Sequence, residues 1–270
     1  MNANPTIALI TPTGGRPKAW ALCERYLSRQ TYPEWVWYIV DDCEPMQEYT
    51  LPNQQIVIRP EWRWKPDQNT QARNMHLLLT TAVAAGANTI LIIEDDEWYS
   101  PRYVEQMVEL LQHWPIVGEG KAKYYCIKNR TWRIYDNIDY ACLCRTGISA
   151  TYASELMRHF DDYPENIDKH FWRNCSEQGK VVFDLHLSVG IKGMPGRLGL
   201  SRAHQGHKSY AQDRHGNKLA EWIGVDTKWY ETFYAPTDHR GDDGWRRLFR
   251  WAGNRRLSPV ATVGTGGVQG

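Results

Sequence analysis

The sequence predicts an α/β fold built on a mostly parallel, Rossmann-like sheet flanked by helices. In the first half, apolar runs of about five residues alternate with segments whose apolar residues recur at helical spacing. Two of these runs end in carboxylates, at Asp41–Asp42 and at Glu94–Glu97. Parallel strands place their C-terminal ends at one edge of a sheet, where open α/β sheets bind ligands. The 270 residues, 42 % of them apolar, can fill one large domain.

The predicted elements can be placed in order along the chain. Pro17 suits the first turn of a helix, Gly86 ends one, and Ser100–Pro101 begins another. In the first half we expect strands at residues 6–10, 35–40, 55–58 and 89–93, with helices at 17–30, at 70–85 and directly after the acidic run. In the second half we expect a hairpin over residues 124–135, strands at 140–144, 181–183 and 185–191, and helices at 153–160 and 168–179. This half adds a small antiparallel part, and the chain becomes irregular after Gly193.

The totals exclude several classes of protein. A net charge of +1 gives no global field toward nucleic acid or membrane, so any such preference must come from a local patch. The six cysteines form no CxxC pair, and we expect them to be reduced thiols of a cytoplasmic protein. The start of the chain lacks a basic region followed by an apolar core, and no apolar run approaches the ~20 residues of a membrane span.

The acidic run Glu94–Glu97 is the strongest chemical signal. Carboxylates that lie close together repel one another unless a cation lies among them. Hard divalent ions with oxygen ligands commonly bind diphosphates in proteins. The run therefore indicates a metal-bound nucleotide substrate. The alternative is a solvated acidic turn at a helix N-terminus, where Asp and Glu are favoured.

The run Leu27–Trp35, followed by Tyr38–Asp42, resembles the Ser-Leu-x-x-Gln-Thr-Tyr … Val-Asp-Asp signature of glycosyltransferase family 2. These are inverting nucleotide-sugar transferases with a GT-A fold. The resemblance covers roughly residues 6 to 205. Four weaker matches follow the order of the family's elements: Ile10–Thr13, Arg16–Pro17, Ala72–Asn74 and Glu94–Asp96. The last of them resembles the family's Asp-x-Asp element, with Glu94 in place of the first Asp. No G-x-G-x-x-G follows the first strand, so nothing supports NAD.

The resemblance implies a role for each matching residue. Thr11 and Asp42 would contact the nucleobase, and Arg73 would support base or phosphate. Glu94 and Asp95 would face the ribose and the donor sugar. Asp96 would bind Mn²⁺ or Mg²⁺.

An inverting transferase also needs a base for the acceptor hydroxyl. The segment Asn166–Arg173 resembles the family's base-bearing helix start, with Ile167 in the place of its Glu, so Asp168 is the expected base. The alternative is that Asp168 only begins a helix. Asp161 and Asp162 are nearby rivals.

His204 and His207 lie in a basic, Gly-containing loop. In GT-A enzymes a His of the C-terminal region often coordinates the metal, so the family resemblance makes His204 or His207 a candidate metal ligand. Arg197, Arg202 and Lys208 could pair with phosphate oxygens.

The acceptor is indicated only by residues 240–256, where arginines alternate with aromatic residues. The candidate acceptor contacts are Arg246, Arg247, Arg250 and Trp251. The pattern suits a phosphate backbone with stacked bases, anionic lipid headgroups, or simple docking of a helix. We therefore expect the acceptor to be a hydroxymethylated DNA base or a saccharide.

The resulting hypothesis is a metal-dependent, inverting hexosyltransferase that uses a nucleotide-diphosphate sugar. Residues 1–205 would form the GT-A domain, with a nucleotide-binding half (1–115) and an acceptor half (116–205). A basic aromatic extension (206–257) and a flexible tail (258–270) would follow. The rivals are a nucleotidyltransferase, which would release pyrophosphate, and a non-catalytic sugar- or nucleic-acid-binding module.

Overall fold

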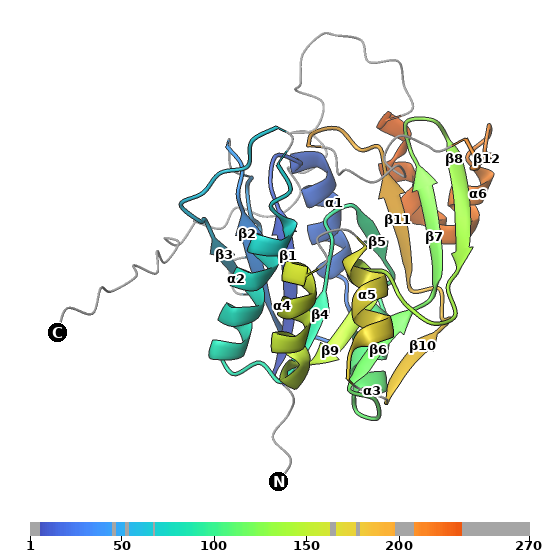
Figure 1. The fold of residues 1–270 in the computed structure, drawn as a ribbon. Coiled ribbons are helices and arrows are strands. Elements are labelled where there is room, and N and C mark those ends of the chain that lie inside the picture. Colours follow the sequence, from blue (N-terminus) through green and yellow to red (C-terminus); the bar gives the residue numbers. More distant parts are fainter. Residues whose placement is uncertain are drawn as a thin grey trace, which may run out of the picture. The chain divides into compact units, whose positions relative to one another are not determined.

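The computed structural model describes residues 6–44, 47–51, 54–66, 68–162, 166–176, 179–197 and 208–233. Within them, the larger of two sheets has seven strands, and only β9 runs antiparallel to its neighbours (Figure 1). In spatial order its strands are β10 (Lys180–Phe183), β6 (Ile116–Glu119), β9 (Thr146–Ser149), β4 (Thr89–Ile92), β1 (Ile7–Thr13), β2 (Trp35–Asp41) and β3 (Gln55–Ile58).

The smaller sheet joins strands from distant parts of the described chain. In spatial order they are β12 (Ala211–Gln212), β8 (Thr131–Asp136), β7 (Lys121–Cys126), β11 (Ser188–Lys192) and β5 (Glu97–Tyr99). The pair β7 and β8 is the predicted hairpin. Strand β5 begins at Glu97, the last residue of the acidic run, and pairs antiparallel with β11, so this sheet begins at the acidic residues.

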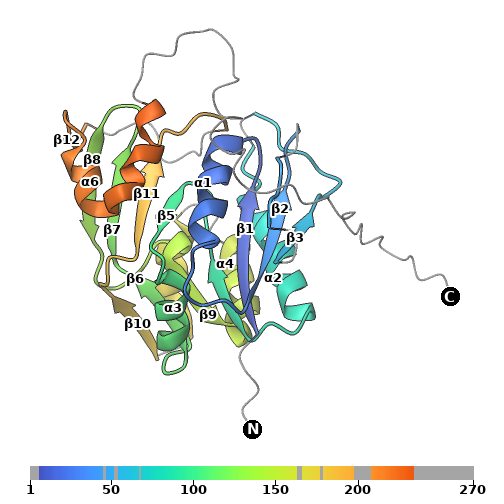
Figure 2. The same ribbon diagram turned by 180° about the vertical axis from the view of Figure 1, so that it is seen from behind.

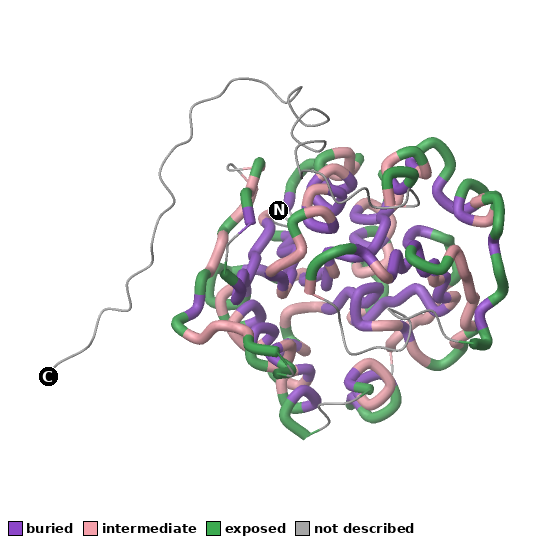
Figure 3. The backbone as a smooth tube through the Cα atoms, turned by 90° about the horizontal axis from the view of Figure 1, so that it is seen from above, coloured by how far each residue is buried: buried purple, intermediate pink, exposed green. Residues whose placement is uncertain are grey.

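Helices cover both faces of the larger sheet. The helices are α1 (Pro17–Leu27), α2 (Gln71–Ala84), α3 (Tyr103–Leu111), α4 (Ala153–Asp162), α5 (Ile167–Asn174) and α6 (Asn217–Ile223). Figure 1 shows α2, α4 and α5 on one face, and Figure 2 shows α1 and α3 on the other. Because both faces are covered, the strands are apolar on both sides: Ala8 and Ile10 belong to one core cluster, and Ile7 and Leu9 to the other. Figure 3 shows this buried centre with exposed segments around it.

The predicted α/β class is confirmed: a mostly parallel sheet flanked by helices, with a smaller antiparallel part. Two local expectations are wrong. Residues 140–144 form no strand; a 3-10 turn, η1 (Leu143–Arg145), precedes β9 instead, because the Arg145 side chain is drawn into the interior. The acidic run leads into β5 rather than a helix, and Ser100 accepts the Tyr103 N–H through its carbonyl rather than capping α3 with its hydroxyl.

Helix ends also differ from the expectation. Helix α1 ends at Leu27 and α5 at Asn174, each earlier than predicted. The described C-terminal part adds α6 and the 3-10 turns η4 (Gly224–Trp229) and η5 (Glu231–Phe233). A further turn, η2 (Ala150–Tyr152), leads into α4.

Candidate active site

The two acidic strand ends lie at the same edge of the larger sheet. Strands β2 and β4 flank β1 in parallel, so their C-terminal ends lie on either side of the end of β1. Thr13 at that end is in register with Asp41, and its hydroxyl donates a 2.6 Å hydrogen bond to Asp95 Oδ2. Its carbonyl accepts the Asp42 N–H. The side chain and backbone of Thr13 therefore connect the two acidic ends.

Arg16 pairs with two carboxylates of the acidic run. Its Nη1 lies 2.9 Å from Asp95 Oδ1, and its Nη2 lies 2.9 Å from Asp96 Oδ2. The backbone N–H of Arg16 donates to Gln47 Oε1, which fixes the loop that carries it. Arg16 therefore supplies a largely buried positive charge just before α1.

Lys192 and Arg145 provide two more buried cations. Lys192 Nζ lies 2.9 Å from Asp96 Oδ2, 2.9 Å from Glu97 Oε1 and 3.8 Å from Glu94 Oε2. Arg145 Nη2 lies 3.1 Å from Glu97 Oε2 and donates to the Lys123 carbonyl. We call Glu94–Glu97 with Arg16, Arg145 and Lys192 the charged cluster.

Burial and mutual repulsion change the proton affinities in the charged cluster. Burial, opposed by Lys192 and reinforced by the neighbouring carboxylates, raises the pKa of Glu94 to about 7. Burial likewise raises the pKa of Asp95, although Arg16 opposes the shift. Burial disfavours the charged form of Lys192, but attraction to Asp96, Glu97 and Glu94 outweighs it and raises the pKa of the ammonium well above its ordinary value.

Asp42 is the centre of a second buried network. Its carboxylate accepts hydrogen bonds from Thr70 Oγ1 (2.5 Å) and Asn74 Nδ2 (2.6 Å), and it pairs with Arg197 Nη1 at 2.7 Å. The Arg197 guanidinium lies over the Trp64 ring, 4.7 Å from its centroid. The Asp42 carboxylate, expected to face a nucleobase, is therefore paired with Arg197, and the Trp64 ring lies against that guanidinium.

Two other residues expected at the nucleotide lie elsewhere. Thr11 is fully buried, and its hydroxyl accepts a 2.8 Å hydrogen bond from Trp37 Nε1. Arg73 is exposed on α2, with its guanidinium over Trp62 at 5.0 Å. Neither residue has a described contact with Asp42 or with the acidic run; the neighbour of Arg73, Asn74, makes the contact instead.

Asp168 lies in the first turn of α5, half-buried. Its carboxylate accepts the Lys169 N–H at 2.8 Å, and burial raises its pKa. Its charge is felt by Cys142, whose pKa is raised to about 11 chiefly by burial and then by Asp168. Cys142 Sγ lies 3.0 Å from Tyr124 Oη, and the Tyr124 ring lies 5.7 Å from Lys192 Nζ. Among the described contacts, none joins the Asp168 carboxylate directly to the charged cluster.

The residues expected to bind metal are only partly described. Glu94, Glu97 and Cys144 offer ligand atoms within 4.8 Å of one another, a group that could hold a metal ion. The carboxylate oxygens suit Mn²⁺ or Mg²⁺, but Lys192 already contacts both Glu residues and Asp96. A divalent ion about 4 Å from an ammonium would meet a repulsion of roughly 8 kcal/mol at an effective dielectric constant of 20. His204, His207, Arg246, Arg247, Arg250 and Trp251 lie outside the described residues.

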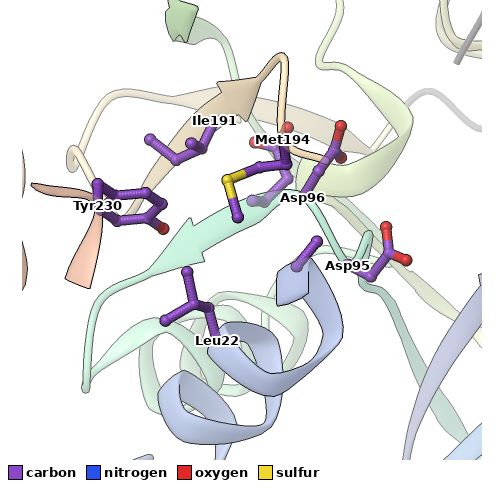
Figure 4. A pocket seen from close by; sticks show the side chains of 8 residues that line it. Leu22, Asp95, Asp96, Ile191, Met194 and Tyr230 are labelled. Atoms are coloured by element: carbon purple, nitrogen blue, oxygen red, sulfur yellow. The ribbon is translucent and has the colours of Figure 1, made fainter. Parts of the chain in front are cut away.

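A small cavity of about 10 Å³ lies beside the acidic run. Asp95, Asp96, Ile191, Met194 and Tyr230 are among the residues that line it, with Met194 beside Asp96 (Figure 4). A cavity of this size holds about one water molecule, whereas small-molecule sites measure roughly 300–1,000 Å³. The cavity is therefore too small to hold a nucleotide.

Lys192 and Arg145 are site residues that the sequence analysis missed. Each is a cation in an otherwise buried segment. Lys and Arg are almost never fully buried unless paired, so a cation predicted inside an apolar strand implies a buried carboxylate partner. That signal was available for Lys192 at the end of the apolar run 187–191, although the sequence does not identify the partner.

None of the helices in the described part of the chain combines the length and apolar composition that a bilayer crossing requires.

Comparison with known proteins gives only structural likenesses. No protein-family model matches the chain, and no curated protein matches it. The chain is similar to TarS from S. aureus, with a TM-score of 0.48, 13 % identity, and coverage of 69 % of this chain and 36 % of TarS. For the complex of TarS 1–349 with UDP, the TM-score is 0.48 and the identity is 14 %, with coverage of 70 % of this chain and 61 % of that chain. For mannosyltransferase PcManGT from Pyrobaculum calidifontis, in complex with GDP-Man and Mn²⁺, the TM-score is 0.47 and the identity is 13 %. The match covers 72 % of this chain and 58 % of that chain.

This chain therefore matches about a third to three fifths of the length of those structures. With TM-scores below 0.5, the likenesses assign no residue role and no reaction to it. They are structures to which the chain is similar.

Proposed function

We propose that the chain is a nucleotide-sugar glycosyltransferase that moves a hexose from a nucleotide diphosphate to an acceptor hydroxyl. The observation that carries the proposal is the meeting of two acidic strand ends, Asp42 and Glu94–Asp96, beside Thr13 at one edge of a parallel sheet. The resemblance of Leu27–Asp42 to glycosyltransferase family 2 supplies the reaction class. In this proposal Asp42, with Thr11 and Arg73 as further candidates, serves the nucleoside, and Glu94 and Asp95 face the ribose and donor sugar.

The proposed reaction is a single displacement with inversion. The acceptor oxygen bonds to the anomeric carbon as the bond from that carbon to the diphosphate breaks, and the acceptor proton passes to the Asp168 carboxylate. Nucleoside diphosphate leaves with the bonding electron pair. The raised pKa of Asp168 supports this role, because a base with higher proton affinity accepts the proton more readily.

Asp96 would hold Mn²⁺ or Mg²⁺, with His204 or His207 as a candidate further ligand. The ion would neutralise the charge that develops on the departing diphosphate. A diphosphate brings about two negative charges, so an ion and a diphosphate entering together leave the net charge of the cluster unchanged. This balance supports entry of the metal with the donor.

For the acceptor we propose a hydroxymethylated DNA base or a saccharide. The basic and aromatic sequence from Arg240 to Arg256 favours testing DNA first. Arg246, Arg247, Arg250 and Trp251 are the candidate contacts.

The test is a panel of nucleotide sugars incubated with Mn²⁺ and, separately, with a chelator. DNA containing hydroxymethylated bases and simple saccharides serve as acceptors. Metal-dependent release of nucleoside diphosphate, with a hexose mass added to one acceptor, is the expected result. Pyrophosphate release would instead indicate a nucleotidyltransferase. Donor binding without release of any product would indicate a binding module.

A further inference from the structure

Lys192 contacts three of the four carboxylates of the acidic run. Its ammonium contacts Asp96 and Glu97 at 2.9 Å and lies 3.8 Å from Glu94. The side chain is only 6 % exposed. Glu94 and Glu97, which Lys192 contacts, also supply two of the three members of the metal-capable group. The ammonium and a bound ion would therefore compete for the same two carboxylates.

The fold holds Lys192 in this position. Strand β11 lies between β5 and β7, so hydrogen-bonded neighbours on both sides fix its backbone. The Lys192 carbonyl accepts the Ile127 N–H at 2.8 Å. Gly190 is in register with Glu97, which brings the two strands close enough for the ammonium and carboxylate to meet. Lys192 is thus a built-in part of the cluster rather than a mobile surface lysine.

The charge balance also indicates that Lys192 and a free divalent ion would not be accommodated together. Four carboxylates, Glu94–Glu97, face three cations, which leaves at most one net negative charge. A divalent ion added to this set would make it net positive, whereas an ion that replaced Lys192 would bring it to neutrality. Buried charges are stable only when paired, so the ammonium and the free ion exclude each other.

We propose that Lys192 is the resident cation of this site and keeps free divalent ions out of the acidic run while no diphosphate is bound. The inference rests on the proposed function only in assigning the ion a purpose. Its test uses MnCl₂ and protein free of nucleotide, so its failure is distinct from failure to find a donor.

The experiment titrates MnCl₂ into chelator-treated, desalted protein and follows the electron paramagnetic resonance signal of free Mn²⁺. Lys192→Met keeps the length of the side chain and removes its charge. It should bind Mn²⁺ more tightly than the wild type by at least about tenfold. Lys192→Arg retains the charge and should show no gain. The matched control is Lys121→Met, at a partly exposed lysine that pairs with Asp184 at 3.2 Å, and it should behave as the wild type.

Circular dichroism and thermal melting establish that each variant is folded. If Lys192→Met does not fold, Lys192→Met combined with Glu97→Gln removes one charge of each sign and takes its place. That double variant must bind Mn²⁺ more tightly than Glu97→Gln alone. A folded Lys192 variant with no gain in affinity over its reference overturns the proposal. Micromolar binding of Mn²⁺ by the nucleotide-free wild type also overturns it.

Discussion

At the scale of single residues, the site depends on carboxylates whose surroundings differ. Asp168 is half-buried at the start of a helix, and burial raises its pKa. Glu94 is the most exposed of the four acidic-run residues, yet its pKa is raised to about 7. Asp95 and Asp96 are held by Arg16. Because their surroundings differ, substitutions of Asp168 and Glu94 should affect different measurable properties.

Asp168→Asn should lower transfer by about 10²- to 10⁴-fold, because the amide cannot accept the acceptor proton. Donor affinity should stay close to that of the wild type, since the acidic strand ends are unchanged. Steady-state kinetics and calorimetric binding of the donor measure the two effects. The matched control is Asp162→Asn, at an exposed position at the end of α4, which should retain full activity. Normal turnover by Asp168→Asn would remove this residue from the mechanism.

The pKa of Glu94 predicts a pH dependence of stability. The folded-state value of about 7 lies above the ordinary 4.5, so the folded state binds more protons between these values. The free energy of unfolding should therefore fall as pH rises through this window, by at most about 1.4 kcal/mol per pH unit from this group. Urea unfolding of Glu94→Gln across the window should show a shallower decline. Glu109→Gln, at an exposed helical position, should decline as the wild type does. An identical decline in Glu94→Gln would show that another group is responsible.

At the scale of elements, packing contacts position the residues of the site. Helix α5 is fixed by Trp172, which is fully buried and donates to Thr146 Oγ1, and a side chain at Gly118 would collide with its ring. The C-terminal turn η4 is fixed by Asp226, which pairs with Arg29 at 2.7 Å and accepts from Trp98 Nε1 at 2.8 Å. Docking of η4 thereby ties the region after α1 to the start of the smaller sheet.

Asp226→Ala should lower the free energy of unfolding by roughly 2–4 kcal/mol, because it leaves the partly buried Arg29 and the buried Trp98 N–H without this partner. Chemical denaturation gives the value. Glu221→Ala, which removes an exposed pair with Lys218, is the control and should change stability by less than about 0.5 kcal/mol. Equal effects of the two substitutions would contradict the view that η4 is held mainly by Asp226.

At the scale of the whole molecule, the sequence correctly predicts those strands and turns that are determined by a local pattern of residues. Apolar runs identified β1, β2, β3 and β4, and the turn residues Asn129–Arg130 identified the hairpin. Strand β5 was missed because its three residues are ordered by pairing with β11, about ninety residues further along the chain. The short turn before β9 was missed for a similar reason, since the buried pairing of Arg145 with Glu97 depends on tertiary contact.

The same division holds for the site. Asp42 and the acidic run could be predicted because parallel strands share an edge. Their cationic partners could not be assigned, because nothing local in the sequence connects Lys192 or Arg197 with a particular carboxylate. The structure shows that each acidic end pairs with a cation from the end of β11 or the segment after it: Lys192 with the acidic run and Arg197 with Asp42.

If the acidic strand ends form a nucleoside-diphosphate site, calorimetric titration with UDP, GDP and other nucleoside diphosphates in the presence of Mn²⁺ should detect it. We expect saturable binding of at least one nucleotide, weakened by about tenfold or more in a folded Asp42→Asn variant. Glu44→Gln, an exposed neighbour, should bind as the wild type does. If folded wild-type protein bound no nucleotide, or if Asp42→Asn bound with equal affinity, Asp42 and the acidic run would not form such a site.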